Sequence, residues 1–403
     1  MKYYIIAGEA SGDLHGSNLV KELHKLDADA KIRCWGGDKM ETAGATVVKH
    51  YRDLAFMGFT EVIKNLPTIL KNITFCKKDI LADKPDVLIL IDYPGFNLRI
   101  AKWAKQQGFK IVYYISPQVW AWKENRVKTI KECVDKMLVI LPFEKDYYKK
   151  WNFEVEYVGH PLVEVVDEFM KTIDHRLQTT DGSSIIDKNS LFTNSKRETK
   201  NEQPETRNEK RASPNKEVIA LLPGSRKQEI LKKLPIMLEV SKHFPQYQFI
   251  VAKAPGLDEN FYNELLSPYT NVSSVLNQTY ALLSSSKAAL VTSGTATLET
   301  ALFAVPEIIC YKGNAVSYQI AKRLIKIKFI GLVNLIMDKE VVKELIQDDL
   351  NMTNIKNELN KLLNDPAKKN QLQNDYQDLK NILSKGGHAS ANAAKSIWLF
   401  LGN

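Results

Sequence analysis

Short apolar runs, each ending at a turn of small or acidic residues, recur along the 403-residue chain. Buried parallel strands give such runs, and the helical spacing of apolar residues after many of the turns predicts strand–turn–helix units. A chain that opens with such a unit predicts a doubly wound α/β domain, here of about six strands. The strands expected in the first part are 3–7, 32–35, 85–91, 110–115, 136–141 and 155–158.

The same pattern restarts in the second part of the chain and predicts a second, similar α/β domain. Its expected strands are 218–222, 249–252, 272–275, 288–291 and 308–311. Helices are expected at 315–325, at 339–346 and over most of 354–401, with a break at 385–387 before a last helix.

A polar segment separates the two parts. Residues 174–216 are rich in Ser, Thr, Asn, Lys and Glu, and they lack the apolar residues needed to form a core. We therefore divide the chain into an N-terminal domain at 1–165, a polar linker at 166–216, a C-terminal domain at 217–385 and a final helix at 386–403, which we allow to cross back to the N-terminal domain.

Two turns in the second domain have the features of an anion site. Residues 288–303 read as a strand, a turn of small residues (Ser293, Gly294, Thr295) and a helix. The N–H groups that open a helix have no partner within it, and the helix dipole adds positive charge there. Gly224, Ser225 and Arg226 follow another strand, and a guanidinium at that place can bind a phosphate. Glu299, one turn into the first helix, can accept hydrogen bonds from sugar hydroxyls.

The first domain carries acids where its strands end. The loop at 8–16, GEASGDLHG, offers Glu9 and Asp13 as carboxylates. Asp92 follows a strongly apolar strand and precedes a Pro-Gly turn, which suits a catalytic base, although Asp92 could simply cap that turn. The other residues that we place at this acceptor side are Gly8, Ser11, Gly12, His15, Trp120 and Trp122, of which the tryptophans could equally be core.

Residues 59–75 carry an apolar stripe at helical spacing with lysines beside it. The stripe either faces the protein core or lies on a membrane surface, and Pro67 predicts a kink or two short helices. The residues assigned to membrane contact are Ile63, Leu66, Ile69, Leu70 and Ile73.

Charge and cysteine content narrow the class of protein. A formal net charge of +9 favours an acidic partner, such as a phosphorylated substrate or an anionic membrane. Four dispersed cysteines are typical of a cytosolic protein with reduced thiols. The first residues contain no long apolar h-region, so we expect no signal peptide, and no apolar run reaches the ~20 residues of a membrane span. The Asp27–Asp29 triplet lies at the end of a helix, and we reject it as a metal site.

A series of motifs, in order along the chain, resembles lipid-A-disaccharide synthases. They are GEASGD at 8–13, MGFTEV at 57–62, IDYPGFN at 91–97, SPQVWAW at 116–122, PFE at 142–144, GHP at 159–161, LLPGSR at 221–226, SGTATLE at 293–299 and VNL at 333–335. The resemblance covers the chain except 174–216. Many family members carry a second Asp after the strand that ends at Asp92, where this chain has Gly95.

The resemblance implies a GT-B fold, with two Rossmann-like domains facing across a cleft and a C-terminal helical segment. It implies an inverting transfer of 2,3-diacylglucosamine from UDP-2,3-diacylglucosamine to the 6-hydroxyl of 2,3-diacylglucosamine 1-phosphate (lipid X), releasing UDP without a cofactor. Asp92 matches an essential acid, with Glu9 or Asp13 to fill the role of the second; Arg226, Glu299 and Asn334 match the nucleotide site.

The expected setting is the cytoplasmic side of the inner membrane of a Gram-negative bacterium, where the protein would bind an anionic surface peripherally. We expect no nucleic-acid partner and leave a homodimer open. Two alternatives remain at this stage: a UDP-sugar 2-epimerase of the same fold, and a peripheral lipid-binding protein without enzymatic activity. UDP release that depends on lipid X separates the three.

Overall fold

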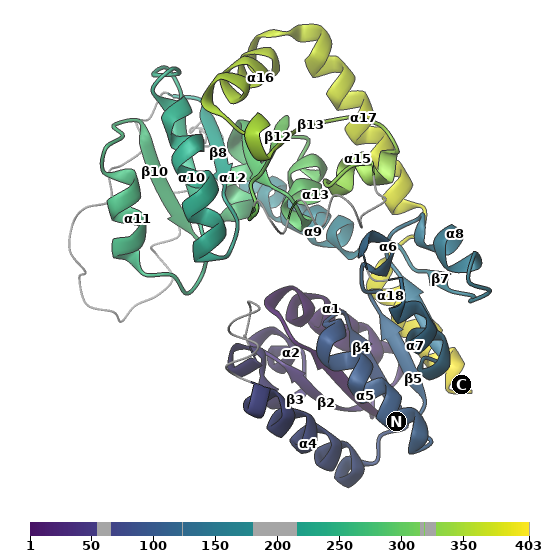
Figure 1. The fold of residues 1–403 in the computed structure, drawn as a ribbon. Helices are drawn as coiled ribbons and strands as arrows, with labels where there is room; N and C mark the ends of the chain where they lie inside the picture. Colours follow the sequence, from purple (N-terminus) through teal and green to yellow (C-terminus); the bar gives the residue numbers. More distant parts are fainter. Residues whose placement is uncertain (55–65, 123, 180–215, 315–317, 319–327, 403) are drawn as a thin grey trace. The chain divides into compact units, whose positions relative to one another are not determined.

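The structure is a computed structural model that describes residues 1–54, 66–122, 124–179, 216–314, 318 and 328–402. These residues form two compact units: unit 1 comprises 1–164 and 382–403, and unit 2 comprises 165–381. Each unit is built around its own parallel sheet (Figure 1).

The sheet of unit 1 has seven strands in the order β3-β2-β1-β4-β5-β6-β7, all parallel. The strands are β1 Lys2–Ala7, β2 Lys31–Gly36, β3 Thr46–His50, β4 Val87–Ile91, β5 Ile111–Tyr114, β6 Lys136–Val139 and β7 Glu156–Tyr157. The helices of this unit are α1 Ala10–Leu26, α2 Asp38–Thr42, η1 Tyr51–Leu54, α4 Leu66–Asp83, α5 Pro94–Gln106, α6 Val119–Trp122, α7 Arg126–Cys133, α8 Glu144–Lys149 and α18 Ala389–Phe400.

Side chains of the central strands alternate between two apolar cores, one on each face of the sheet. Tyr3 and Ile5 of β1 pack into the core on the face of α1 and α18. Tyr4 and Ile6 pack into the other core, which α4, α5 and α7 cover. Because both faces are buried, the central strands are continuously apolar, as the sequence indicated.

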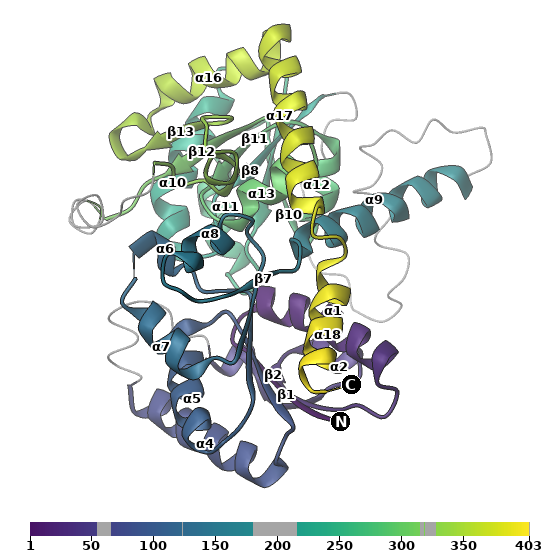
Figure 2. The same cartoon turned by 90° about the vertical axis from the view of Figure 1, so that its right-hand side faces the viewer.

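The C-terminal helix α18 belongs to unit 1. Ala393, Ala394 and Ile397 are fully buried in the same core as α1, and Figure 2 shows α18 lying along α1. Small side chains at two of these positions allow the two helices to approach closely. The chain therefore leaves unit 1 through α9 (Pro161–Thr179), which continues into unit 2, and returns through α17 (Pro366–Ser384).

The sheet of unit 2 has six parallel strands in the order β10-β9-β8-β11-β12-β13. They are β8 Val218–Leu222, β9 Gln248–Lys253, β10 Val272–Leu276, β11 Ser286–Thr292, β12 Glu307–Tyr311 and β13 Lys343–Ile346. The further helices are α10 Lys227–Ser241, α11 Glu259–Leu266, α12 Thr279–Ser285, α13 Thr295–Leu302, α15 Leu332–Met337, η4 Gln347–Asp349 and α16 Met352–Asn364.

Two doubly wound α/β domains and a C-terminal helical segment were predicted, and both are confirmed. Several elements differ. Strand β3 was not expected, and the helix expected at 339–346 is instead strand β13, while 332–337 is a helix. Helix α9 runs to Thr179 through the start of the expected linker. Pro67 is the second residue of α4 as described, and the residues before Leu66, on which the predicted kink or pair of short helices depends, lie outside the described ranges.

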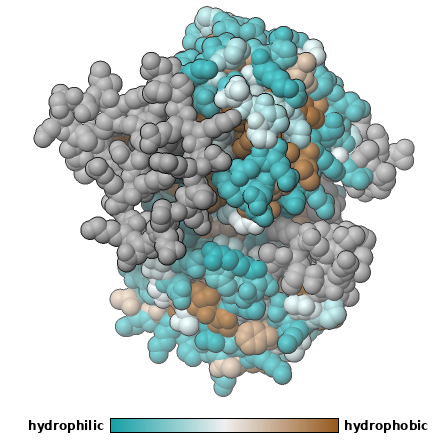
Figure 3. All heavy atoms as spheres, turned by 90° about the vertical axis from the view of Figure 1, so that its left-hand side faces the viewer, coloured by the Kyte–Doolittle hydropathy of each residue, from teal (hydrophilic) through white to brown (hydrophobic). Residues whose placement is uncertain are grey.

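No described helix is long and apolar enough to cross a bilayer. On the face drawn in Figure 3, the described surface is mostly hydrophilic, and apolar side chains form small, separate patches.

Candidate functional site

The strand order of unit 1 reverses direction between β1 and β4, which pair side by side, with Ala7 opposite Ile91. At such a point the helices that follow the two strands cover opposite faces of the sheet, and a crevice opens at the carboxyl ends of the strands. Glu9 lies just beyond β1, and Asp92 immediately follows β4. The fold therefore brings these two predicted acids to the place where open α/β sheets bind ligands.

The backbone at Asp92 is held in an unusual conformation. Asp92 and Tyr93 have φ angles of 42° and 48°, in the left-handed region that residues with side chains avoid. The Asp92 carbonyl oxygen accepts hydrogen bonds from the Asn97 amide at 2.8 Å and from the Tyr113 hydroxyl at 2.5 Å. Backbone strain of this kind persists where surrounding groups fix it and occurs frequently at active sites.

Gly8 is required by the Tyr93 ring. A Cβ atom at Gly8 would lie 2.4 Å from ring carbons of Tyr93, so any side chain there would displace the ring. Tyr93 in turn stacks on Phe96 with the ring centroids 5.7 Å apart. The glycine that opens the GEASGD motif thus allows the β4–α5 turn to pack against the end of β1.

Asp92 has the electrostatics of a general base. Its side chain keeps an exposed face, but the surrounding protein removes much of its water, and the nearby Glu9 charge disfavours a second anion. Both effects raise the pKa of Asp92 to about 6, with desolvation the larger. A carboxyl group with a pKa near neutrality takes up a proton more readily than an ordinary aspartate does.

Asp13 has a structural task instead of the catalytic one that we allowed for it. It is 3% exposed, and its carboxylate accepts backbone N–H groups of Gly37 at 2.7 Å, Met40 at 3.1 Å and Lys39 at 3.2 Å. Asp13 therefore caps the start of α2 from a neighbouring helix. Of the two acids that we allowed for the second role, Glu9 is therefore the one that remains a candidate.

The other residues of the 8–16 loop divide into packing and surface positions. Gly12 lies against the Ala7 side chain, and Ser11 is exposed. His15 is buried, and desolvation lowers its pKa to about 4, so it is neutral at physiological pH. His15 is thus part of the packed base of the loop.

Trp120 of the SPQVWAW segment is hydrogen-bonded to Glu144, a buried carboxyl group that ends the PFE motif and to which the sequence analysis gave no role. Glu144 is 1% exposed, and it accepts hydrogen bonds from the Leu141 N–H at 3.0 Å and from the Trp120 indole at 3.3 Å. Desolvation raises the pKa of Glu144 to about 8. The ring of Trp120 also packs edge-on against Phe143. The side chain of Trp122 lies outside the described residues.

Unit 2 has an equivalent crevice position, between β8 and β11, where its strand order reverses. Gly224 and Gly294 have φ angles of 109° and 120°, which only glycine adopts easily. At these two glycines the chain turns from the strand into α10 or α13. The first N–H groups of each helix therefore lie beside the strand ends and have no partner within the helix. The predicted residues Ser225, Ser293 and Thr295 flank these turns and are exposed or half-buried.

A charged cluster lies at this strand end. The Arg226 guanidinium pairs with Glu229 at 2.8 Å, and the Lys233 ammonium lies 3.6 Å from the other oxygen of Glu229. Lys233 is 2% exposed and donates a hydrogen bond to the Thr292 hydroxyl at the end of β11. Sequence reasoning missed Lys233, although it falls on the apolar stripe of α10, where a lysine is unusual.

Glu299 lies on α13 and accepts a hydrogen bond from the Tyr280 hydroxyl at 2.9 Å. Its side chain is half-buried, and desolvation raises its pKa, while the hydrogen bond from Tyr280 opposes the rise. Tyr280 packs in turn against the rings of Phe169 and Phe303. Glu299 is thus held in position by an aromatic cluster.

Asn334 does not have the nucleotide-binding geometry that the resemblance implied. Its side chain is fully buried and donates to the Val342 carbonyl at 2.8 Å and to Glu344 at 2.9 Å. Its oxygen accepts the N–H groups of Val341 at 2.8 Å and Val342 at 3.0 Å. An amide side chain offers two donors and two acceptor sites, and all four are used. Asn334 therefore holds the segment before β13.

The described part of the predicted apolar stripe is divided between the core and the surface. Ile73 is 8% exposed within the core of unit 1, and Ile69 packs against it, so Ile73 is wrongly assigned to membrane contact. Leu70 is 51% exposed and stays a candidate. Ile63 and the side chain of Leu66 lie outside the described residues.

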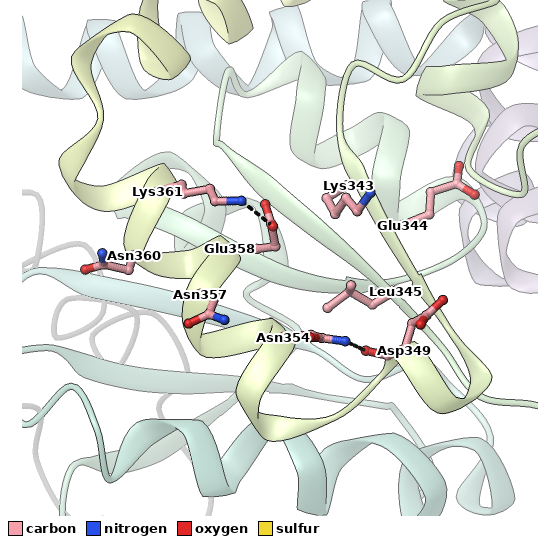
Figure 4. Close-up of a pocket in the computed structure, with 9 residues that line it drawn as sticks. All are labelled: Lys343, Glu344, Leu345, Asp349, Asn354, Asn357, Glu358, Asn360 and Lys361. Carbon is pink, nitrogen blue, oxygen red and sulfur yellow. Dashed lines mark hydrogen bonds and ion pairs between the residues drawn. The ribbon is translucent and has the colours of Figure 1, made fainter.

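Unit 2 also contains a polar pocket of about 560 Å³, drawn in Figure 4. It is lined by residues of β13, η4 and α16, several of which already pair with one another, including Glu358 with Lys361 at 2.7 Å. None of the strand-end residues described above lines it, so we do not assign the substrate to it. Within the described ranges, no group of three or more His, Cys, Asp or Glu residues could hold a metal ion.

Comparison with known sequences gives one consistent family. A family model described as lipid-A-disaccharide synthetase matches residues 3–188 and 191–398. The lipid-A-disaccharide synthase of Syntrophus aciditrophicus is 37% identical over 98% of this chain and 97% of its own length. Those of Geobacter sulfurreducens, and of Legionella pneumophila (lipid-A-disaccharide synthase 1), are each 36% identical, over 95% and 94% of this chain and 93% and 92% of their own lengths.

Solved structures share the fold at low sequence identity. The UDP-GlcNAc 2-epimerase of Neisseria meningitidis, bound to UDP-GlcNAc, superposes with a TM-score of 0.65 at 14% identity, over 99% of this chain and all of that one. The calicheamicin glycosyltransferase CalG4 has a TM-score of 0.57 at 15% identity, over 100% and 98% of the two chains. This likeness concerns the fold alone, and the sequence relatives do not favour the epimerase alternative.

Proposed function

Because the chain belongs to the lipid-A-disaccharide synthetase family, we propose that it transfers 2,3-diacylglucosamine from UDP-2,3-diacylglucosamine to the 6-hydroxyl of lipid X. The chain is thus a glycosyltransferase of lipid A biosynthesis. The observation that carries the proposal is the family match over nearly the whole chain. The two strand-end sites, one acidic and one cationic, supply the chemistry that such a transfer needs.

The acidic site of unit 1 serves the acceptor. The Asp92 carboxylate takes the proton of the acceptor 6-hydroxyl while the oxygen of that hydroxyl attacks C1 of the donor sugar. The bond from C1 to the diphosphate breaks on the opposite side of the sugar, so the configuration at C1 inverts, and Asp92 later passes its proton to water. The raised pKa of Asp92 supports this role, because a base is most effective when its pKa lies near the working pH.

The cationic site of unit 2 serves the donor. The leaving UDP gathers negative charge on its diphosphate, which the Arg226 guanidinium and the N–H groups at the start of α13 can stabilise. The Glu299 carboxylate can accept hydrogen bonds from the ribose hydroxyls, since it lies one turn into the same helix. Diphosphate recognition is thus expected from Arg226 before α10 together with the start of α13, and ribose recognition from Glu299 on α13.

Both substrates carry acyl chains, so the protein must meet them at a membrane. The exposed face of α4 is a suitable surface: Leu70, Phe75 and Leu81 are 51%, 45% and 46% exposed, and Lys71 and Lys78 lie exposed beside them. Each inserted apolar side chain contributes about 1.5–3 kcal/mol, and each lysine near anionic headgroups adds about 1 kcal/mol. Reversible peripheral binding needs no more than this.

The α4 surface is tested by flotation with vesicles that contain anionic lipid. Replacing Leu70 and Leu81 by Ser should weaken or abolish flotation and leave the melting temperature nearly unchanged, because these side chains are exposed. Phe75 is kept, because its ring centroid lies 6.0 Å from that of the buried Trp35. Ile73→Ser is the matched control, and it should lower the melting temperature. If the double variant floats as the parent does, the acyl chains are reached through another surface.

The reaction is tested by measuring UDP release from purified protein with and without lipid X. We expect release only when both UDP-2,3-diacylglucosamine and lipid X are present, and a loss of turnover by about 10²–10⁴-fold in Asp92→Asn. UDP release that is independent of lipid X would indicate an epimerase or hydrolase. No release under any condition would leave a binding protein and refute the proposal.

A further inference from the structure

A buried lysine at the donor site has no role in the reaction as described so far. Lys233 is 2% exposed in the second turn of α10, among Ile230, Leu234 and Met237. Removing an ammonium group from water is costly unless it is paired, and desolvation lowers the pKa of Lys233 accordingly. A cation that is kept in such a place despite its cost requires an explanation in terms of its partners.

The partners of Lys233 connect it to both strand ends. Its ammonium donates to the Thr292 hydroxyl at the end of β11 and lies 3.6 Å from Glu229. A Cβ atom at Gly224 would be 3.6 Å from the same ammonium and 3.0 Å from Glu229, so the cluster lies directly beneath the β8–α10 turn. Lys233 therefore faces the turn that we assign to the diphosphate.

Glu229 is shared between two cations. One carboxylate oxygen pairs with Arg226 at 2.8 Å, and the other lies 3.6 Å from Lys233. In this arrangement Arg226 is engaged by a carboxylate, and a diphosphate must compete with that carboxylate for the guanidinium. If Glu229 had no other cation, releasing Arg226 would leave a carboxylate unpaired next to an incoming anion.

We propose that Lys233 is the counter-charge that lets Arg226 exchange partners: when a nucleoside diphosphate binds Arg226, the Glu229 carboxylate transfers its ion pair to Lys233. The inference rests on the proposed donor site and adds a residue that controls its affinity. Lys233 is a positioning residue, since it acts through Glu229 and does not touch the phosphates. The longer distance from Lys233 to Glu229 before binding is what an exchange requires, because that contact can still shorten.

The test is a double-mutant cycle on UDP binding, measured by calorimetry. Lys233→Met should weaken UDP binding roughly 10- to 100-fold, as expected for a lost charge-assisted contact. In the Glu229→Gln background the same change should have little effect, because no carboxylate remains to be neutralised. Uridine, which has no phosphate, should bind equally to the parent, the two single variants and the double variant. Weaker uridine binding in Lys233→Met would instead mean that the substitution disturbs the fold of the site.

Matched controls separate charge from packing. Lys232→Met changes the exposed lysine next in sequence and should leave the UDP affinity at the parent value. Lys233→Gln keeps a hydrogen-bond donor for Thr292 without the charge and should weaken UDP binding as Lys233→Met does, which also covers the case in which the Met variant does not fold. In steady-state kinetics the loss should appear in KM for the donor.

Two results would overturn the exchange. UDP affinity unchanged in Lys233→Gln would show that the lysine is only part of the core. A loss that persists in the Glu229→Gln background would show direct contact between Lys233 and the phosphates. Arg226→Ala distinguishes this failure from a failure of the donor site itself: if it binds UDP as the parent does, the donor site is wrongly assigned, and the exchange falls with it.

Discussion

Because the pKa of Asp92 is raised, the fall of kcat/KM at acidic pH is the most direct probe of the acceptor site. With a pKa of about 6, Asp92 is roughly 97% ionised at pH 7.5 and only about 10% ionised at pH 5. Only the ionised form can accept the proton of the acceptor. The value of kcat/KM should therefore fall about tenfold between these pH values. An ordinary aspartate would stay ionised over the whole range and give a flat profile.

A variant of Glu9 is the control that shows whether the acid limb of the kcat/KM profile comes from Asp92 and its neighbour Glu9. Its charge is the second cause of the raised pKa of Asp92, after desolvation. Glu9→Gln removes the charge but keeps the size of the side chain, so the pKa of Asp92 should fall and the acid limb should move to lower pH. The rate above pH 7 should change little, because Asp92 is already ionised there.

The assay is UDP release under kcat/KM conditions from pH 5 to 8, with circular dichroism at each pH to confirm that the protein stays folded. Asp92→Asn should lose turnover while keeping the UDP affinity of the parent. A flat profile in the parent, or an acid limb that Glu9→Gln does not move, would refute the assignment of Asp92 and Glu9 as a coupled pair.

Four further outcomes follow from the structure. Asp13→Ala should lower the free energy of unfolding by about 3 kcal/mol or more, since each buried N–H left without an acceptor costs about 1–3 kcal/mol; a variant as stable as the parent would contradict its capping role. Glu307 is buried, neither carboxyl oxygen has a partner among the described groups, and its pKa is raised well above 4.5. The stability that this carboxyl contributes is lost as pH rises, so Glu307→Gln should melt higher than the parent at pH 8 and show a smaller gain at pH 5; an equal difference at both pH values would exclude the titration of Glu307 as the cause. Glu299→Ala should weaken UDP binding more than binding of a pyrophosphate probe, as competition calorimetry would show; equal losses would speak against ribose recognition. Turnover should survive excess EDTA, because Arg226 and the start of α13 stabilise the leaving group; a loss restored by added Mg²⁺ would contradict this.

The two sheets and the polar residues at the ends of their strands were predictable from sequence because the signal is local. A parallel strand buried on both faces must be apolar throughout, and the residues just after it are free to be polar. Asp92 and Arg226 were chosen as candidates in this way, and both lie where their sheet reverses strand order. The positions of glycines such as Gly224 and Gly294 indicated the turns, and their φ angles show why glycine is needed.

Other features depend on tertiary contacts that no local pattern reveals. Strand β13 has a mixed sequence, KELI, whose pairing with β12 decides its conformation. Asp13 looked catalytic because its partners lie on α2, 24 to 27 residues away along the chain. Lys233 and Glu144 are buried titratable groups whose partners become visible only in three dimensions.

The measurement that tests the central claim most directly is the identification of the product. Purified protein would be incubated with UDP-2,3-diacylglucosamine and lipid X, and the lipid product analysed by mass spectrometry and by the proton coupling at the new anomeric centre. We predict a tetra-acylated disaccharide 1-phosphate with a β-1,6 linkage, formed in equal amount to UDP. An α linkage, or an epimerised donor sugar without a disaccharide, would contradict an inverting transfer.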